Sequence, residues 1–213
     1  METIQSWHNE ALAATTIKAL QKNGFEALYF PTQGEAVAYV ADNISEQASV
    51  GVGGSMTLQE IGIVKLLKDR GNLMLDHSDP ELSDAEKMDC RRRQSGCDVF
   101  LTSTNAITMD GKLINVDGAG NRVAAMIFGP KQVMVIAGVN KIAVDVQSAI
   151  DRIETYASPM NNKRLGRPNP CVTSGVCMDC QGPARICNVT TIMHRKPSLI
   201  ATTVILVGEK LGY

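Results

Sequence analysis

Apolar residues recur along this chain in two alternating patterns, one with helical spacing and one in short continuous runs. Helical spacing covers 2–23, 33–44, 57–70, 121–128 and 144–156, and a charged helix is predicted over about 83–95. Short apolar runs suited to buried strands cover 25–30, 49–52, 72–75, 99–102, 112–116, 132–137 and 200–207. Strands that alternate with helices predict βαβ units, and therefore an α/β fold with a mostly parallel sheet and helices on both faces.

The alternation stops after the helix that ends near Tyr156. The stretch from Ser158 to Cys187 is rich in Pro, Gly and Asn and shows neither periodicity. A structureless stretch of this length inside a domain is commonly functional. We therefore expect one α/β domain over residues 1–213, with an irregular Cys-rich insertion over 158–195 that precedes the last strand.

Composition and charge narrow the possible partners. Hydrophobic residues make up 44% of the 213 residues and charged residues 20%, as in an ordinary globular protein. The formal net charge of −1 supplies no field that would recruit nucleic acid or anionic lipid. No apolar run approaches the roughly 20 residues that span a bilayer, and no signal peptide is evident. We expect a cytoplasmic protein with no nucleic-acid partner and no membrane span, in which thiols stay reduced.

Four of the six cysteines fall in one short window with the spacing C-x5-C-x2-C-x6-C. They are Cys171, Cys177, Cys180 and Cys187. Thiolates suit iron–sulfur clusters and zinc, and structural zinc sites usually contain two short-spaced pairs rather than one. The spacing therefore favours a metal site that holds a [4Fe–4S] cluster, with zinc as the alternative; reactive or merely buried thiols remain a third possibility. Cys90 and Cys97 are predicted to be small buried residues.

Two polar loops are candidate ligand sites. Residues 49–57 read as a strand, a glycine turn and a helix start, and the free N–H groups of such a turn favour an anion. The alternative is a tight turn with an ordinary serine cap. Asp110-Gly111 predicts a hairpin turn, and residues 117–122 form a second polar loop that opens a helix. Ligands bind at such loops in open α/β folds, although small polar residues can also simply satisfy the loop backbone.

These blocks, at 50–55, 98–107, 110–118 and 120–125, resemble the LUD-domain family, the lactate utilization proteins. The resemblance implies a fold similar to ribose-5-phosphate isomerase, glucosamine-6-phosphate deaminase and CoA transferases, in which the glycine turn grips a phosphate or other anion. Carried over by position, the ligand-binding candidates are Gly53, Gly54, Ser55, Asp117, Asn121 and Arg122. A LUD domain does not itself require the cysteine segment, so the chain resembles a cysteine-bearing subgroup.

Three functions are compatible with these features. The first is a redox-linked lactate utilization protein, in which an iron–sulfur cluster lies next to a pocket for a small anionic substrate and the chain acts with other lactate-oxidation components. The second is a zinc-stabilised hydrolase, isomerase or transferase of a phosphorylated or CoA-like small molecule. The third is a non-catalytic scaffold or sensor. Whether the chain is an enzyme stays open, because Glu60 and Lys141 lie in plausible regions without a matched motif and the three histidines are scattered.

Overall fold

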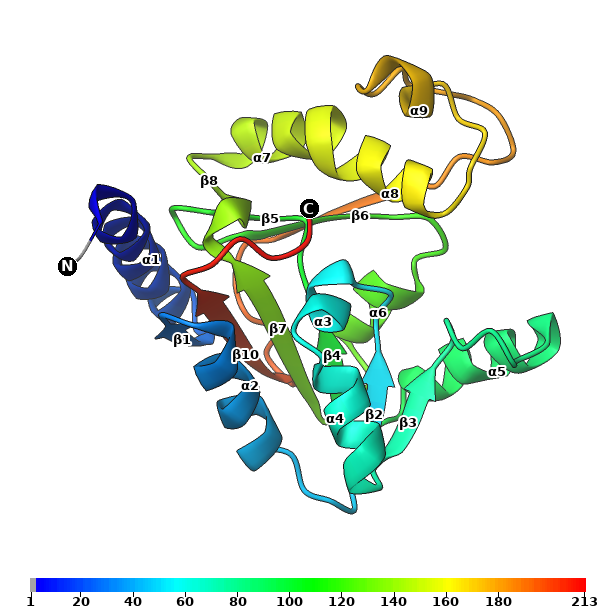
Figure 1. Cartoon of the computed structure of the whole chain (residues 1–213), viewed down its shortest axis with the longest axis horizontal. Coiled ribbons are helices and arrows are strands. Elements are labelled where there is room, and N and C mark those ends of the chain that lie inside the picture. The colour runs from blue at the N-terminus through cyan, green and yellow to red at the C-terminus, as the bar shows by residue number, and fades with distance from the viewer. Residues whose placement is uncertain (1–2) are drawn as a thin grey trace.

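A computed structural model describes residues 3–213 and contains two β-sheets (Figure 1). The larger sheet has six parallel strands in the order β1-β10-β7-β4-β2-β3. They are β1 (Glu26–Phe30), β2 (Ser49–Val52), β3 (Leu73–Asp76), β4 (Val99–Thr102), β7 (Gln132–Gly138) and β10 (Ala201–Val207). The predicted parallel sheet is confirmed, and each of these strands lies within one or two residues of an apolar run in the sequence.

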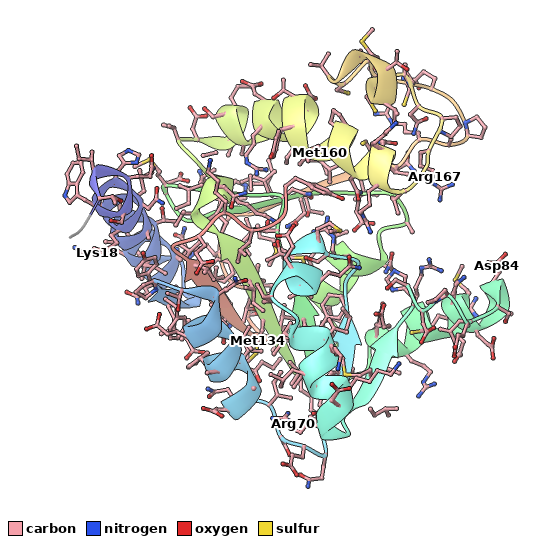
Figure 2. All side chains as sticks on the ribbon, in the orientation of Figure 1. Lys18, Arg70, Asp84, Met134, Met160 and Arg167 are labelled. Carbon is pink, nitrogen blue, oxygen red and sulfur yellow. The ribbon has the colours of Figure 1, made fainter. Side chains whose placement is uncertain are left out.

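Helices cover both faces of this sheet. One face carries α1 (Ile4–Lys22), α5 (Asp84–Gln94) and α6 (Asn121–Ile127); the other carries α2 (Gln33–Asp42), α3 (Met56–Glu60) and α4 (Ile63–Arg70). Side chains alternate along the central strand β7, so that Val133 and Val135 join the first layer while Met134 and Ile136 join the second. Figure 2 labels Met134 in the middle of the sheet, near α2 and α4. Among residues 3–213, no helix is both long and apolar enough to cross a bilayer.

The sequence did not predict the second sheet. Its four strands, in the order β8-β5-β6-β9, are β5 (Ala106–Thr108), β6 (Leu113–Asp117), β8 (Ile142–Ala143) and β9 (Val189–Met193). The predicted hairpin turn at Asp110-Gly111 joins β5 to β6, and Gly111 adopts the left-handed conformation with φ +81°. Helix α7 (Val146–Arg152) packs on this sheet through Ala149. The sequence predicted β6 as the apolar run 112–116 but gave no signal for β8, which has two residues, or for β9, which is partly polar.

The segment expected to be irregular contains regular structure. A π-helical turn (Ile153–Ala157) continues α7 into α8 (Ser158–Arg164), α9 (Cys171–Ser174) follows, and β9 lies within the predicted 158–195 insertion. Pro159 does not break the helix because it lies directly after the π-helical turn, where the regular hydrogen-bond pattern is already interrupted. Residues 175–188 carry no helix or strand. The irregular stretch is thus shorter than predicted, and an insertion spanning 158–195 is not confirmed.

Cys90 and Cys97 lie in the core, as the sequence predicts. They belong to the same buried cluster, and their exposed fractions are 7% and 2%. The Cys97 thiol donates to the carbonyl oxygens of Gln94 and Val99 at 3.0 and 3.2 Å. Burial raises the pKa of both thiols, so both stay protonated near neutral pH.

Candidate functional site

A polar cleft of about 270 Å³ lies where the parallel strands end. In Figure 1 the arrowheads of β2, β3 and β7 point toward the layer that contains α7 and α8. The sheet side of the cleft is formed by Gly54, Ser55, Thr57, His77, Ser103 and Lys141, which follow β2, β3, β4 and β7. The opposite side is formed by Asp117, Gly118, Asn121, Arg122, Asn161, Arg164 and Arg167. The carboxyl ends of parallel strands are where open α/β folds bind ligands.

The cleft is rich in positive charge. Five of its lining side chains are basic: Arg91, Arg122, Lys141, Arg164 and Arg167. Asp117 is the one acidic side chain among the lining residues, and its carboxylate lies 3.2 Å from Nε of Arg122. Figure 2 labels Arg167 just beyond the end of α8. Basic side chains that converge on a small concave site favour a small anionic ligand.

The structure brings the predicted ligand-binding residues together. Gly54, Ser55, Asp117, Asn121 and Arg122 all line the cleft, although they come from two separate loops. The Ser55 hydroxyl accepts from the Leu58 backbone N–H at 3.4 Å and therefore caps the short helix α3, which is the alternative that the sequence left open.

Gly53 lies behind the cleft and is not among its lining residues. Its backbone N–H donates to the Leu101 carbonyl at 2.9 Å. A Cβ on Gly53 would approach Oγ1 of Thr102 to 2.9 Å and the side chain of Arg122 to 3.4 Å. Gly53 therefore makes room for the Thr102 side chain, with Arg122 at ordinary contact distance, whereas a Cβ on Gly54 would meet nothing closer than Nε2 of His77 at 4.0 Å.

The two glycines are expected to respond differently to alanine. Gly53→Ala should lower the free energy of unfolding by about 1–3 kcal/mol, because the added methyl group would lie only 2.9 Å from Oγ1 of the buried Thr102. Gly54→Ala, the matched control, should leave stability within about 0.5 kcal/mol of the parent protein. Urea denaturation of the two variants measures the difference. Equal stabilities would show that the Thr102 side chain can shift without cost.

The guanidinium of Arg122 is fully occupied by the protein. Besides the contact with Asp117, it donates to the side-chain oxygens of Asn105 (3.0 Å) and Asn115 (2.5 Å) and to the carbonyl oxygens of Ser103 (3.3 Å) and Val116 (2.8 Å). These five bonds use all five N–H donors of an arginine. Arg122 thus contributes charge to the cleft wall while its hydrogen bonds hold the wall together.

Lys141 lines the cleft although the sequence offered no motif that would assign it to a site. It ends a 3₁₀ turn (Val139–Lys141) directly after β7, and its exposed fraction is 3%. Its Nζ donates to the hydroxyls of Thr57 and Ser103, both at 2.9 Å. Burial, with Arg152 and Arg122 as nearby cations, lowers the pKa of Lys141 to about 7. The only available signal in the sequence was its position directly after an apolar strand.

His77 was likewise not assigned from sequence, and it lies at the cleft directly after β3. Its Nδ1 is 3.0 Å from Nε2 of Gln94. Burial and the nearby Arg91 lower the pKa of His77, which favours a neutral ring at neutral pH. His77 is thus a polar, uncharged part of the cleft wall near neutral pH.

The four clustered cysteines lie near one another on α9 and the irregular segment that follows it. Burial raises the pKa of Cys171, and the thiols of Cys180, Cys187 and Cys177 raise it further, so the four groups are close enough to interact electrostatically. A cavity of about 270 Å³ is lined by Cys177 and Cys187 together with Ser158. Within residues 3–213, however, no three His, Cys, Asp or Glu side chains converge closely enough to hold a metal ion.

The cysteine segment is hydrogen-bonded to the end of β6 and the loop that follows it, at the edge of the cleft. The Asn188 backbone N–H donates to the Asp117 carbonyl at 3.0 Å, and its side chain donates to the Gly118 carbonyl at 3.1 Å. Ile186 lines the cleft, while its neighbour Cys187 lines the adjoining cavity. The loop that bears Asp117 therefore lines the cleft and is hydrogen-bonded to the residue that follows the last cysteine.

A larger cavity of about 810 Å³ lies elsewhere, between α4, β3 and α5. Its lining mixes apolar side chains such as Leu73 and Leu82 with charged residues of both signs, and Cys90 is among them. The raised pKa of Cys90 keeps that thiol protonated. The smaller cleft is the better candidate site because buried and cationic groups converge there.

Comparisons with known proteins agree with this architecture. The family model of the LUD domain matches residues 13–207. The crystal structure of a DUF162 family protein from Deinococcus radiodurans is similar, with a TM-score of 0.53 and 15% identity, covering 94% of this chain and 98% of that one. At this identity the likeness shows the fold alone. No curated protein matches the chain.

Proposed function

The chain belongs to the LUD domain family, and we propose that it is a redox-linked, lactate-utilization-type protein that carries an iron–sulfur cluster and binds a small anionic substrate. The cluster is [4Fe–4S], and its ligands are Cys171, Cys177, Cys180 and Cys187. Such a cluster supplies one-electron transfer when it is bound. The chain acts as one component alongside other lactate-oxidation proteins, with the polar cleft as the substrate site.

The chemistry of the donor set fits a cluster. Four thiols interact on a segment that has little helix or strand of its own, so ligation can supply the folding free energy that burial does not. The Asp179 backbone N–H donates to Sγ of Cys177 at 3.4 Å, so one hydrogen bond already reaches a proposed ligand sulfur. Arg185 donates to the carbonyl oxygens of Cys180 (2.6 Å) and Cys187 (3.0 Å) and brings a positive charge to the same place.

The observation that carries the proposal is the shared wall between the cysteine segment and the cleft. Val116 lines both cavities, and Asn188 ties the residue after Cys187 to the Asp117–Gly118 loop. Helix α8 also lies between the cysteine segment and the cleft. Its Ser158 Oγ is 3.5 Å from Sγ of Cys187, and its Arg164 lines the cleft. A redox group on one side of this wall is therefore adjacent to a ligand on the other.

The anionic substrate follows from the balance of charge in the cleft. Asp117 is engaged by Arg122, so the remaining basic groups have no carboxylate among the lining side chains to neutralise them. A volume of about 270 Å³ is large enough for a small hydroxy acid or phosphorylated molecule. Lactate, a small carboxylate, fits within this volume and has the expected charge.

Metal analysis of protein purified without oxygen tests the cluster. We expect brown protein with broad absorption near roughly 400 nm, about four irons and about four acid-labile sulfides per chain, and no zinc. Colourless protein that takes up no iron during anaerobic reconstitution would remove the cluster from the proposal.

A second candidate is a zinc-stabilised hydrolase, isomerase or transferase of a phosphorylated or CoA-like small molecule. The observation in its favour is the buried Lys141 among hydroxyl groups at the strand ends, which suits proton transfer without a redox group. About one zinc per chain, no iron, and retained binding of inorganic phosphate would favour this candidate over the first.

A further inference from the structure

We propose that Lys141, together with the hydroxyls of Thr57 and Ser103, forms the subsite that holds the charged oxygen atoms of the cleft ligand, and that the ligand binds together with one proton taken up by the Lys141 amine. This inference rests on the anion cleft of the proposed function and adds to it the recognising group and its protonation. No bond to the ligand is formed or broken; the neutral amine gains one proton from solvent and becomes an ammonium group.

The burial of Lys141 is the first argument. The C-terminal segment crosses over its side chain, and a Cβ on Gly212 would lie 3.5 Å from Nζ. Asn140 holds that segment in place by accepting from the Leu211 N–H at 3.1 Å, while the Gly212 N–H donates to Glu60 at 2.6 Å. An amine so enclosed either loses its proton or needs a partner that compensates its charge, because an ammonium group is costly to remove from water.

The protein supplies hydroxyls but no carboxylate to this amine. Among the residues that the structure describes, Lys141 forms no ion pair, and its two partners are the neutral hydroxyls of Thr57 and Ser103. An ammonium group has three N–H donors, so one more remains for a ligand. Because Lys141 lines the cleft, an anion in the cleft can accept this third bond.

The charges around Lys141 explain why a proton should accompany the ligand. Arg152 on α7 and Arg122 on α6 disfavour the ammonium form, and only Glu60 on α3 favours it. With burial, these groups lower the pKa of Lys141 to about 7, so the amine is only partly protonated near neutral pH. A bound anion would favour the ammonium form and so raise the pKa of Lys141. Because such coupling is reciprocal, protonation of Lys141 would also strengthen anion binding.

Calorimetry of the full-length protein tests this coupling with two probes, sulfate and L-lactate, whose charges stay constant between pH 6 and 8.5. At constant ionic strength, affinity should fall roughly thirty-fold over this range as the amine loses its proton, and titrations in buffers of different ionisation enthalpy should show close to one proton taken up at pH 8 and above. Preference for sulfate indicates a tetrahedral oxyanion such as a phosphate group, and preference for lactate indicates a carboxylate.

Two variants separate the subsite from general charge effects. Lys141→Met keeps the apolar length of the side chain and should abolish the pH dependence, with at least a tenfold loss of affinity at pH 6. Lys65→Met removes a lysine that is 79% exposed and paired with Asp69, and should bind both anions as the parent protein does. Binding that is independent of pH and unchanged in Lys141→Met overturns the inference but leaves the anion cleft intact. No binding of either anion at pH 6 overturns both.

A chemical measurement on the unsubstituted protein keeps the inference testable if Lys141→Met does not fold. Isocyanic acid, which is in equilibrium with cyanate, adds across the N–H bond of a neutral amine to give a urea without a leaving group, and peptide mass spectrometry reports the modified lysine. The rate at Lys141, divided by the isocyanic acid concentration at each pH, should reach half its maximum near pH 7, and saturating sulfate should slow it and move the midpoint upward. A midpoint near the ordinary lysine value of about 10.4, or no protection by sulfate, contradicts the inference.

Discussion

Replacing Cys187 with serine is expected to abolish iron binding and to release the cysteine segment from the body of the protein. A serine hydroxyl is a poor ligand for iron in a sulfur-bound cluster, so the iron content should fall from about four per chain to less than about one. Loss of the cluster also removes the ligation energy that organises residues 175–188, which carry no helix or strand. Amide hydrogen exchange over this segment should therefore accelerate at least tenfold, whereas exchange in the six-stranded sheet should change little.

The matched control is Cys90→Ser, which makes the same substitution at a cysteine in the core. This variant should keep its full iron content, although it loses some stability because a hydroxyl replaces a buried thiol. Iron and sulfide quantification with hydrogen-exchange mass spectrometry distinguishes the two variants. If Cys187→Ser kept a full complement of iron, Cys187 would not be a ligand. If Cys90→Ser lost iron to the same extent, the loss would reflect misfolding.

The parallel sheet could be predicted because its strands are continuous apolar runs that alternate with helical patterns. Residues such as Val133 to Ala137 are buried on both faces and read as an unbroken apolar run, flanked by helical periodicity. In the second sheet only β6 left such a run, at 112–116. Strand β8 has two residues, and β9 has exposed residues at Val189 and Thr190, so neither forms an apolar run. Their pairing with β5 and β6 depends on contacts between residues far apart in sequence, which local periodicity does not carry.

The candidate site was predictable only where it lay in loops with a distinctive composition. Gly54, Ser55 and Asp117 belong to such loops, and the structure places them around one cleft. Lys141 directly follows a strand, and the nearby Gly138 and Asn140 do not match a known ligand-loop motif, so its importance comes from burial by the C-terminal segment. The role of Arg122 also depended on the fold, because its five hydrogen-bond partners lie on β6 and on the residues that follow β4.

Arg122→Met is expected to lower the free energy of unfolding by about 3–5 kcal/mol. The substitution leaves the buried Asp117 carboxylate without its partner and removes a hydrogen bond from each of Asn105 and Asn115 and from two backbone carbonyls. Arg91→Met removes another arginine from the cleft and should cost less than about 1 kcal/mol, while it weakens sulfate binding. Urea denaturation at pH 7 gives both values. An Arg122→Met variant with unchanged stability but no sulfate affinity would show that the guanidinium serves the ligand.

A double-mutant cycle with Asp117→Asn identifies the source of the cost. Asp117 is 8% exposed at its side chain, and its carboxylate also accepts from the Gly120 N–H at 2.8 Å, a bond that asparagine can retain through its amide oxygen. If the unpaired carboxylate is the main penalty in Arg122→Met, neutralising it should restore part of the stability, and the double variant should be about 1–3 kcal/mol more stable than the sum of the two single effects. Strictly additive losses would instead assign the cost to the amide and carbonyl partners. The wall between the cleft and the cysteine segment would then be held by hydrogen bonds to Arg122 rather than by its ion pair with Asp117.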